Sequence, residues 1–311
     1  MEILQFEPEM AAGVARCYSD LVAGVPHCAP VSAEAFAALE PLAGPRAHSD
    51  EMLVARGANS EVAGFVHLAV AAPPTEDGHP KDEPGLIRFL SYRPGQRAVG
   101  QALLDAAESW VRERERPSIL AWCNDYMYPF YHLPFAHLSE RISHVHALFG
   151  LREYTVHWSE LLFEWRDFTP PAAVRPDLDF ELRIEPLENI TIGHKVMATG
   201  LAVRALRGTQ EVGVCGMARA GEDFPRTNAS DWCFCYELHV EESLRGHGLG
   251  KFLLATGLGE MKSLGCPHAA ISTDWDNYRA ALFYANVGYR LIDRTFSFRK
   301  EMSGGGGAAQ D

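Results

Sequence analysis

The chain has 311 residues, of which 47% are hydrophobic and 22% charged, and its formal net charge is −13 with a pI near 5.5. This length suits two domains of about 150 residues each, and the acidic charge disfavours binding to nucleic acid or to an anionic membrane, because both need a basic surface. The charge mildly favours a cationic substrate such as an amine, although an acidic surface also serves solubility alone.

Two segments lack the hydrophobic pattern of a folded element. Residues 167–177 contain three prolines and no apolar period, which predicts a linker. Residues 303–311 are rich in glycine and have nothing to bury, so they are predicted to be a disordered tail. The sequence therefore predicts an N-terminal domain over 1–166 and a C-terminal domain over 178–302.

Hydrophobic periodicity predicts the same order of elements in both halves. The first half reads as a strand at 2–6, helices at 11–25 and 33–42, strands at 51–55, 62–70 and 86–92, a helix at 99–113, a strand at 118–123, a helix at 135–148 and a strand at 155–163. The second half reads as a strand at 180–184, a short helix at 190–199, strands at 202–206, 212–218 and 233–240, a helix at 249–264, a strand at 269–272, a helix at 278–285 and a strand at 290–298. This repeat predicts two copies of one α/β (α+β) module, each a mixed, mostly antiparallel sheet flanked by helices.

A short pattern recurs in the two halves. Arg97-Ala-Val-Gly100-Gln-Ala102 and Arg245-Gly-His-Gly248-Leu-Gly250 each follow a predicted strand and open a predicted helix. Glycine lets an anion approach the backbone without a Cβ in the way, and the N–H groups and dipole at a helix start attract a diphosphate. By itself such a turn is a weak signal, because plain tight turns look the same.

The residues around the second copy of this pattern make it more specific. Glu237 to Gly250 reads Glu-Leu-His-Val-Glu-Glu-Ser-Leu-Arg-Gly-His-Gly-Leu-Gly, and Asn277 to Tyr289 reads Asn-Tyr-Arg-Ala-Ala-Leu-Phe-Tyr-Ala-Asn-Val-Gly-Tyr. These segments resemble the two acetyl-CoA signatures of the GCN5-related N-acetyltransferase (GNAT) family, at the expected separation. The resemblance covers most of residues 178–300 and, more weakly, residues 1–165, in a mycothiol-synthase-like two-domain arrangement.

The resemblance implies acetyl-CoA as the cosubstrate and assigns roles to individual residues. Tyr284 is implied to lie near the thioester sulfur and to protonate the leaving thiolate, a role that suits a phenol. Asn277 is implied either to hydrogen-bond the pantetheine arm or to order the turn before its helix. The residues of the second half implied to contact CoA are Leu238, Val240, Arg245, Gly246, His247, Gly248, Leu249, Gly250, Asn277 and Phe283.

The attacking amine must be neutral, so another group must accept its proton. Glu237 is the first candidate, because it is an acid in an otherwise apolar predicted strand. His239 is the second candidate. It lies two residues beyond Glu237 and is therefore expected on the same face of the strand, whereas Tyr236 is expected on the opposite face. A structural ion pair for Glu237 and a packing role for His239 stay open. Backbone N–H groups near Leu238–Val240 are expected to polarise the thioester carbonyl.

The first copy is expected to be degenerate. It keeps Arg97, Gly100 and Ala102, which are expected to form a CoA-binding turn. In the first copy, Phe89 stands at the position of Glu237, Ser139 at that of Asn277, and His146 at that of Tyr284. It has therefore lost the expected acid and base, although an imidazole at residue 146 is still able to donate a proton.

Residues 124–134 form an aromatic insert between a strand and a helix predicted in the first half. The insert is interpreted either as a wall of the acceptor site or as inter-domain packing. The second copy has a much shorter connection between its first two strands, in the region that covers the acceptor pocket in the resembled family. We therefore expect the second copy to borrow a wall from the first.

The seven cysteines are odd in number and lack zinc spacing, and the histidines between 132 and 146 lack the i, i+4 spacing of a metal site. The cysteines are predicted to be reduced thiols of a cytoplasmic protein. The first residues do not read as a signal peptide, and no apolar run is long enough to span a membrane. No cysteine lies in a nucleophile context, so direct attack in a ternary complex is expected without a metal.

The sequence thus predicts an N-acetyltransferase that moves the acetyl group of acetyl-CoA to a primary amine on a small molecule or a peptide. A monomer and a homodimer both stay open. The alternative is a non-catalytic acyl-CoA-binding or regulatory module, against which Glu237 and Tyr284 argue.

Overall fold

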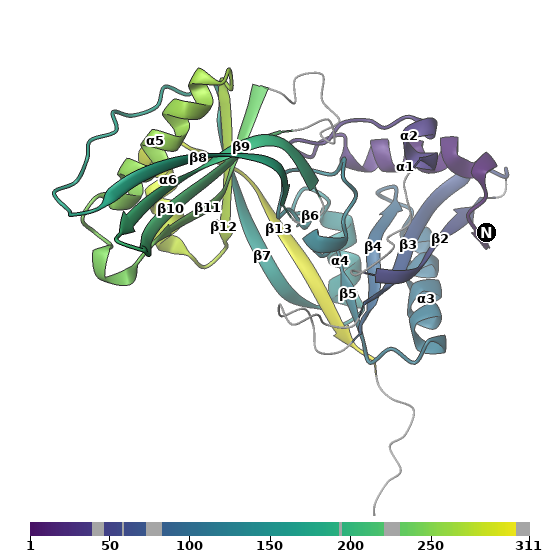
Figure 1. Ribbon diagram of the computed structural model, residues 1–311. Coiled ribbons are helices and arrows are strands. Elements are labelled where there is room, and N and C mark those ends of the chain that lie inside the picture. The colour runs from purple at the N-terminus through teal and green to yellow at the C-terminus, as the bar shows by residue number, and fades with distance from the viewer. Residues whose placement is uncertain (39–46, 58, 73–82, 193–194, 221–230, 303–311) are drawn as a thin grey trace, which may run out of the picture. The chain divides into compact units, whose positions relative to one another are not determined.

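The computed structural model describes the chain except for residues 39–46, 58, 73–82, 193–194, 221–230 and 303–311 (Figure 1). The predicted tail therefore lies outside the described residues. The chain divides into two compact units. Unit 1 comprises 1–128, 136–159 and 295–311, and unit 2 comprises 129–135 and 160–294.

Unit 1 contains a sheet whose strands β1 to β4 pair antiparallel in sequence order, while β4 pairs parallel with β5. Its elements are β1 (Glu2–Gln5), α1 (Ala11–Val22), α2 (Ala33–Ala37), β2 (Ala47–Arg56), β3 (Val62–Ala71), β4 (Gly85–Tyr92), α3 (Arg97–Glu113), β5 (Ser118–Ala121), β6 (Leu138–Ser139), α4 (Ser143–Leu151) and parts of β7 (Thr155–Trp165) and β13 (Arg290–Glu301).

Unit 2 repeats this topology. Its strands β8 to β11 pair antiparallel in sequence order, and β11 pairs parallel with β12. Its elements are β8 (Glu181–Ile192), β9 (Lys195–Arg207), β10 (Gln210–Arg219), β11 (Trp232–Val240), α5 (Leu249–Ser263), β12 (His268–Asp274) and α6 (Tyr278–Val287). The predicted fold class, two modules with mixed and mostly antiparallel sheets flanked by helices, is confirmed.

The units exchange their last strands, so they are not two consecutive halves of the chain. In unit 1, β5 pairs antiparallel with residues 298–301 of β13, from the end of the sequence. In unit 2, β12 pairs antiparallel with residues 160–165 of β7, which precede the predicted linker. Each sheet is therefore completed by a strand from the other half of the sequence.

One predicted helix is wrong, and a second begins later than predicted. Residues 190–192 and 195–199 belong to the paired ends of β8 and β9, with Ile190 opposite Met197. The alternating Ile-Thr-Ile run favours a strand over a helix. The helix predicted over 135–148 begins only at Ser143. Phe135 before it has a positive φ of 64°, and Leu138–Ser139 pairs with β13.

The predicted linker contains no helix or strand, and its first residues are nevertheless fixed in unit 2. The backbone N–H of Asp167 donates to His268 Nδ1 (2.9 Å). Phe168 is fully buried in the core of unit 2, and its backbone N–H donates to the carbonyl of Pro267 (3.0 Å). The segment therefore adds to the unit 2 core rather than acting only as a spacer.

One buried histidine makes the stability of unit 1 depend on pH. Burial lowers the pKa of His137 to about 4, against about 6.5 in an unfolded chain, and its Nδ1 accepts from the backbone N–H of Asn124 (3.2 Å). As pH falls below 6.5 the unfolded chain binds the proton first, so this contribution is present above pH 6.5 and is lost toward pH 4.

We expect the free energy of unfolding to fall by roughly 2 kcal/mol between pH 7.5 and pH 5 through this residue alone. Urea titrations at the two pH values would measure it, and His137→Asn should flatten the dependence. The exposed His247→Asn is the control, and equal pH slopes for the two variants would contradict the assignment.

Candidate functional site

A cavity of about 620 Å³ lies in unit 2 and brings the two signature segments together. Three pieces of chain line it: the end of β11, the turn into α5, and the first turns of α6. The lining residues are Leu238, His239, Val240, Leu244, Arg245, Gly246, Gly248, Leu249, Gly250, Lys251, Asn277, Arg279, Ala280, Leu282, Phe283, Tyr284 and Asn286. Of the CoA-contacting residues predicted in this half, only His247 is not among them.

The cavity forms where two parallel strands separate. β11 pairs with β12 only from Trp232 to Cys235, opposite His268 to Ile271, yet β11 continues to Val240. Backbone groups on this edge of β11 beyond residue 235 therefore have no partner on β12. The opening gives an extended ligand a strand edge to hydrogen-bond.

The turn into α5 combines two left-handed glycines with a helix start. Gly246 and Gly248 have φ of 86° and 87°, and α5 begins at Leu249. A Cβ at Gly246 would meet nothing within 4 Å, so the backbone faces open space. The Arg245 guanidinium donates from Nε to the carbonyl of Val240 (3.0 Å) and so fastens the turn to the strand.

The opposite wall of the cavity is α6. Asn277 caps this helix, because its Oδ1 accepts from the backbone N–H of Ala280 (3.1 Å). Of its two predicted roles, the structure thus shows the ordering of the turn. Tyr284 is buried with its ring against Phe163 (centroids 5.8 Å apart), and burial raises the pKa of its phenol well above the usual range. The group is a protonated donor at neutral pH.

Of the two base candidates on β11, His239 lines the cavity and Glu237 does not. The strand register skips Tyr236, since Glu237 pairs with Gly216 and Cys235 with Met217. This bulge shifts the alternation of side chains, so Leu238 and Val240 pack toward the helices, as Cys235 does. Glu237 and His239 are exposed.

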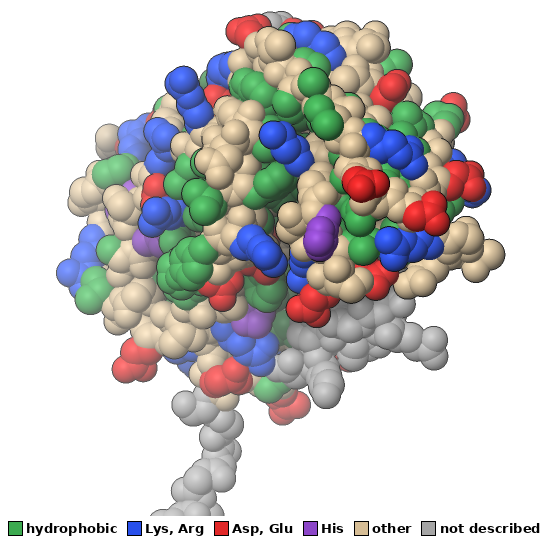
Figure 2. Space-filling view, turned by 90° about the vertical axis from the view of Figure 1, so that its left-hand side faces the viewer, with side chains coloured by type: hydrophobic (Ala, Val, Ile, Leu, Met, Phe, Trp, Pro, Cys, Tyr) green, Lys and Arg blue, Asp and Glu red, His purple; other side chains and the backbone are tan. Residues whose placement is uncertain are grey.

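Two cations of the cavity wall were missed by the sequence prediction. Lys251 and Arg279 lie in the first turns of α5 and α6, line the cavity, and have no ion pair among the described residues. Lys and Arg side chains lie among exposed hydrophobic ones on the side of the molecule that Figure 2 shows. The signal was available in the sequence, because Lys251 follows the glycine turn directly and Arg279 lies near the start of the Asn277–Tyr289 segment. A phosphate site needs positive charge near a helix start.

The corresponding place in unit 1 is filled by side chains. The Arg97–Ala102 pattern opens a helix as predicted, but α3 already begins at Arg97, so Gly100 lies inside the helix and not in a turn before it. A Cβ at Gly100 would lie 2.5 Å from the ring of Tyr92, so this glycine makes room for a tyrosine. The Tyr92 hydroxyl donates to the carbonyl of His144 (2.8 Å), and the His144 ring lies 2.9 Å from the carbonyl of Tyr92.

The other substituted positions of unit 1 also serve packing. Phe89 is fully buried among aromatic rings, including Trp122 (4.2 Å between centroids) and Tyr128 (4.9 Å). The His146 Nε2 lies 3.2 Å from the carbonyl of Ser139. The positions in unit 1 that match Glu237 and Tyr284 thus hold side chains with packing or hydrogen-bonding partners within that unit.

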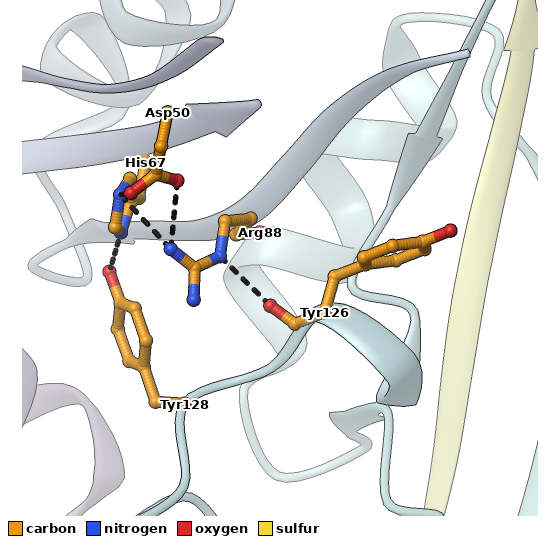
Figure 3. A network of polar contacts seen from close by, with 5 residues as sticks. All are labelled: Asp50, His67, Arg88, Tyr126 and Tyr128. Atoms are coloured by element: carbon orange, nitrogen blue, oxygen red, sulfur yellow. Dashed lines mark hydrogen bonds and ion pairs between the residues drawn. The ribbon is translucent and has the colours of Figure 1, made fainter. Parts of the chain in front are cut away.

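A buried polar network ties three strands of unit 1 to the start of the aromatic insert (Figure 3). His67 lies between Asp50 (Nε2 to Oδ2, 3.0 Å) and the Tyr128 hydroxyl (Nδ1, 2.8 Å). Arg88 donates to Asp50 (2.9 Å) and, through Nε, to the carbonyl of Tyr126 (3.0 Å). The groups satisfy one another, and the network fixes residues 126–128.

In the described ranges no group of three or more His, Cys, Asp or Glu side chains is placed to hold a metal ion. No helix in the described part of the chain is long and apolar enough to cross a membrane.

Comparison with known proteins agrees with this geometry. Residues 159–289 match the model of the acetyltransferase (GNAT) family, and these bounds nearly coincide with the main segment of unit 2. No curated protein sequence shows a detectable match.

Three solved structures share the fold over 96% of this chain. A tandem GNAT protein from the clavulanic acid biosynthesis pathway is 16% identical, with a TM-score of 0.65 over 98% of its length. A GCN5-related N-acetyltransferase from Sphaerobacter thermophilus is 15% identical, with a TM-score of 0.60 over 95% of its length. A GCN5-related glucosamine N-acetyltransferase region of a fungal multi-domain β-N-acetylglucosaminidase is 14% identical, with a TM-score of 0.66, and the match covers 38% of that chain.

The likeness in fold spans both units, and the family match lies in the unit that has the cavity. The chain therefore has the fold of a tandem GNAT protein, and the family match of residues 159–289 supports acyl transfer in general.

Proposed function

We propose that unit 2 transfers the acetyl group of acetyl-CoA to a primary amine by direct attack in a ternary complex. The observation that carries this proposal is one cavity that joins a strand edge without a partner, an open glycine turn at a helix start, and a buried phenol. The strand edge suits the pantetheine arm of acetyl-CoA, the glycine turn suits its diphosphate, and the phenol suits the leaving thiolate.

The proposed chemistry assigns one task to each group. Backbone N–H groups of residues 246–250 hold the diphosphate, and those near Leu238–Val240 polarise the thioester carbonyl. Glu237, assisted by His239, accepts the proton of the amine, directly or through water. The amine nitrogen attacks the carbonyl carbon, the C–S bond breaks, and Tyr284 donates its proton to the departing sulfur.

Two buried cysteines of unit 2, Cys215 and Cys233, are poor nucleophiles. The adjacent Cys235 thiol, together with burial, holds the pKa of Cys215 well above its usual value. The neighbouring Cys266 and burial do the same for Cys233. Since the thiolate is the reactive form, neither is suited to carry an acetyl group.

The test of the function is release of the CoA thiol from acetyl-CoA with a panel of amines. Release that depends on an amine supports acetyl transfer. Binding of acetyl-CoA without release by any amine would instead favour the non-catalytic acyl-CoA-binding module.

Gly248→Asp is expected to abolish saturable acetyl-CoA binding without unfolding the protein. The new carboxylate would face the diphosphate, and two like charges about 4 Å apart near a protein surface repel by roughly 4 kcal/mol, so we expect a Kd at least ~100-fold weaker. Calorimetry measures the Kd directly.

Gly208→Asp is the matched control for this variant. Gly208 also has a positive φ, of 60°, and open space around its Cβ position, but it lies between β9 and β10 and does not line the cavity. The backbone strain is therefore comparable while the charge is remote. Equal affinities for the two variants would remove the diphosphate from this turn.

A further inference from the structure

The face of the unit 2 sheet opposite α5 and α6 is covered in part by the aromatic insert of the first half. Residues 129–135 belong to unit 2. Leu133 is buried there in a cluster with Trp232 and Phe234 of β11, and the ring of Phe135 lies 5.9 Å from that of Phe234. Alternate residues on the other side of β11, such as Cys233, face the helices.

A buried pair fixes this segment in unit 2. The side chains of His132 and Asp293 are both fully buried, with Nε2 3.0 Å from Oδ2. The backbone N–H of Leu133 donates to His132 Nδ1 (2.8 Å), so the ring proton is on Nε2 and points to the carboxylate. The N–H of Arg294 donates to the other oxygen of Asp293 (2.9 Å). The segment is thus held at its centre by charge-assisted hydrogen bonds.

The edge of this cluster is half-buried rather than closed. Four hydrophobic side chains pack against it while keeping part of their surface exposed: Phe135, Ile190, Tyr236 and Ile292. Glu237 follows Tyr236 in the strand and lies three residues beyond Phe234, which is about 10 Å along a strand. An apolar rim and an exposed carboxylate therefore lie side by side on this face.

The charges on this face favour a single amine. The Glu237 carboxylate has no ion pair among the described residues. Arg204, which shares the face through its register with Val214 and His239, is paired with Glu185 (3.0 Å) and Glu211. An ammonium group thus finds the Glu237 carboxylate beside hydrophobic surface, while the two acids next to Arg204 are already paired with that arginine.

We propose that the acceptor is a primary amine carried on an aromatic or other compact apolar group, an inference that rests on the proposed function. Residues 129–135 form the wall against which that group packs. Phe135 is then a specificity-determining residue supplied by the first half of the sequence. The amine end lies at Glu237, on the side of β11 from which it reaches the thioester through the opening between β11 and β12.

The test uses the full chain with 2-phenylethylamine and spermidine as acceptors. We expect a lower KM for 2-phenylethylamine than for spermidine. Phe135→Ala should raise the KM for 2-phenylethylamine about tenfold or more, since the lost apolar contact is of the size of a buried ring. It should leave the Kd for acetyl-CoA unchanged by calorimetry, which also shows that the protein remains folded. Ligand-observed NMR on the CoA complex gives the affinity for 2-phenylethylamine without turnover.

Two further variants make the outcome decisive. Phe135→Tyr keeps the ring and should keep the KM. Trp158→Ala removes a half-exposed aromatic side chain of unit 1 and should change nothing. Preferred turnover of spermidine, or an unchanged KM in Phe135→Ala, would overturn this inference while leaving acetyl transfer intact. Failure of every amine to release CoA would overturn the proposed function itself.

Discussion

Tyr284→Phe is expected to lower kcat by ~100-fold or more while the Kd for acetyl-CoA stays near that of the unaltered protein. The ring packs against Phe163 in either case, so only the hydroxyl is lost, and removal of a general acid typically costs two orders of magnitude or more. Burial keeps the pKa of this phenol raised, so the effect should persist at every pH from 6 to 9. Single-turnover kinetics measured beside calorimetry separates chemistry from binding.

Tyr278→Phe is the matched control, because it removes a hydroxyl from the same helix at an exposed position that does not line the cavity. We expect wild-type turnover from it. Wild-type turnover from Tyr284→Phe as well would mean that water or another group protonates the thiolate.

The second large effect is expected from cutting the chain. A fragment of residues 175–302 matches the predicted C-terminal domain, yet it lacks the β7 residues that complete the sheet of unit 2. These include Leu161, Leu162 and Phe163, all buried. At about 1.5–3 kcal/mol for each buried side chain, the loss is roughly 5 kcal/mol, comparable with the whole stability of a domain. We expect this fragment to be unfolded or aggregated.

A fragment of residues 159–294 is the informative comparison. It keeps the β7 strand and omits the part of β13 that belongs to unit 1, so it should be the more stable of the two by circular dichroism and urea titration. It also lacks residues 129–135, so we expect it to bind acetyl-CoA but to lose acceptor selectivity. A stable, fully active 175–302 fragment would show that neither the exchanged strand nor the insert matters to unit 2.

Local signals in the sequence were sufficient to predict the fold class and the parts of the cavity. The glycine turn and the Asn277–Tyr289 segment are each short and contiguous, and the structure places both against one cavity. The element order was predictable for the same reason, since strand and helix periods are properties of neighbouring residues.

Features that depend on residues far apart in the sequence were not predictable in this way. Gly100 reads as a phosphate-binding glycine until the ring of Tyr92 is found beside it. The bulge at Tyr236 is visible only from the register of β11 with β10. Unit 1 has a matching bulge at Arg88 in β4, because His67 pairs with Phe89 and Leu68 with Ile87. The paired bulges show the repeat more clearly than the sequence does. The exchange of β7 and β13 leaves no local trace at all.

The strand exchange also bears on the order in which the protein is made. Sheet formation in unit 1 needs residues 298–301 opposite 118–121, so unit 1 stays incomplete until almost the whole chain has left the ribosome. Unit 2 is complete once residue 294 has emerged. Domains usually fold from the N-terminus onward during synthesis, and here we expect the reverse, with the first unit closing last. Limited proteolysis of ribosome-bound chains halted after residue 294 has emerged would show it, as protection of unit 2 before unit 1.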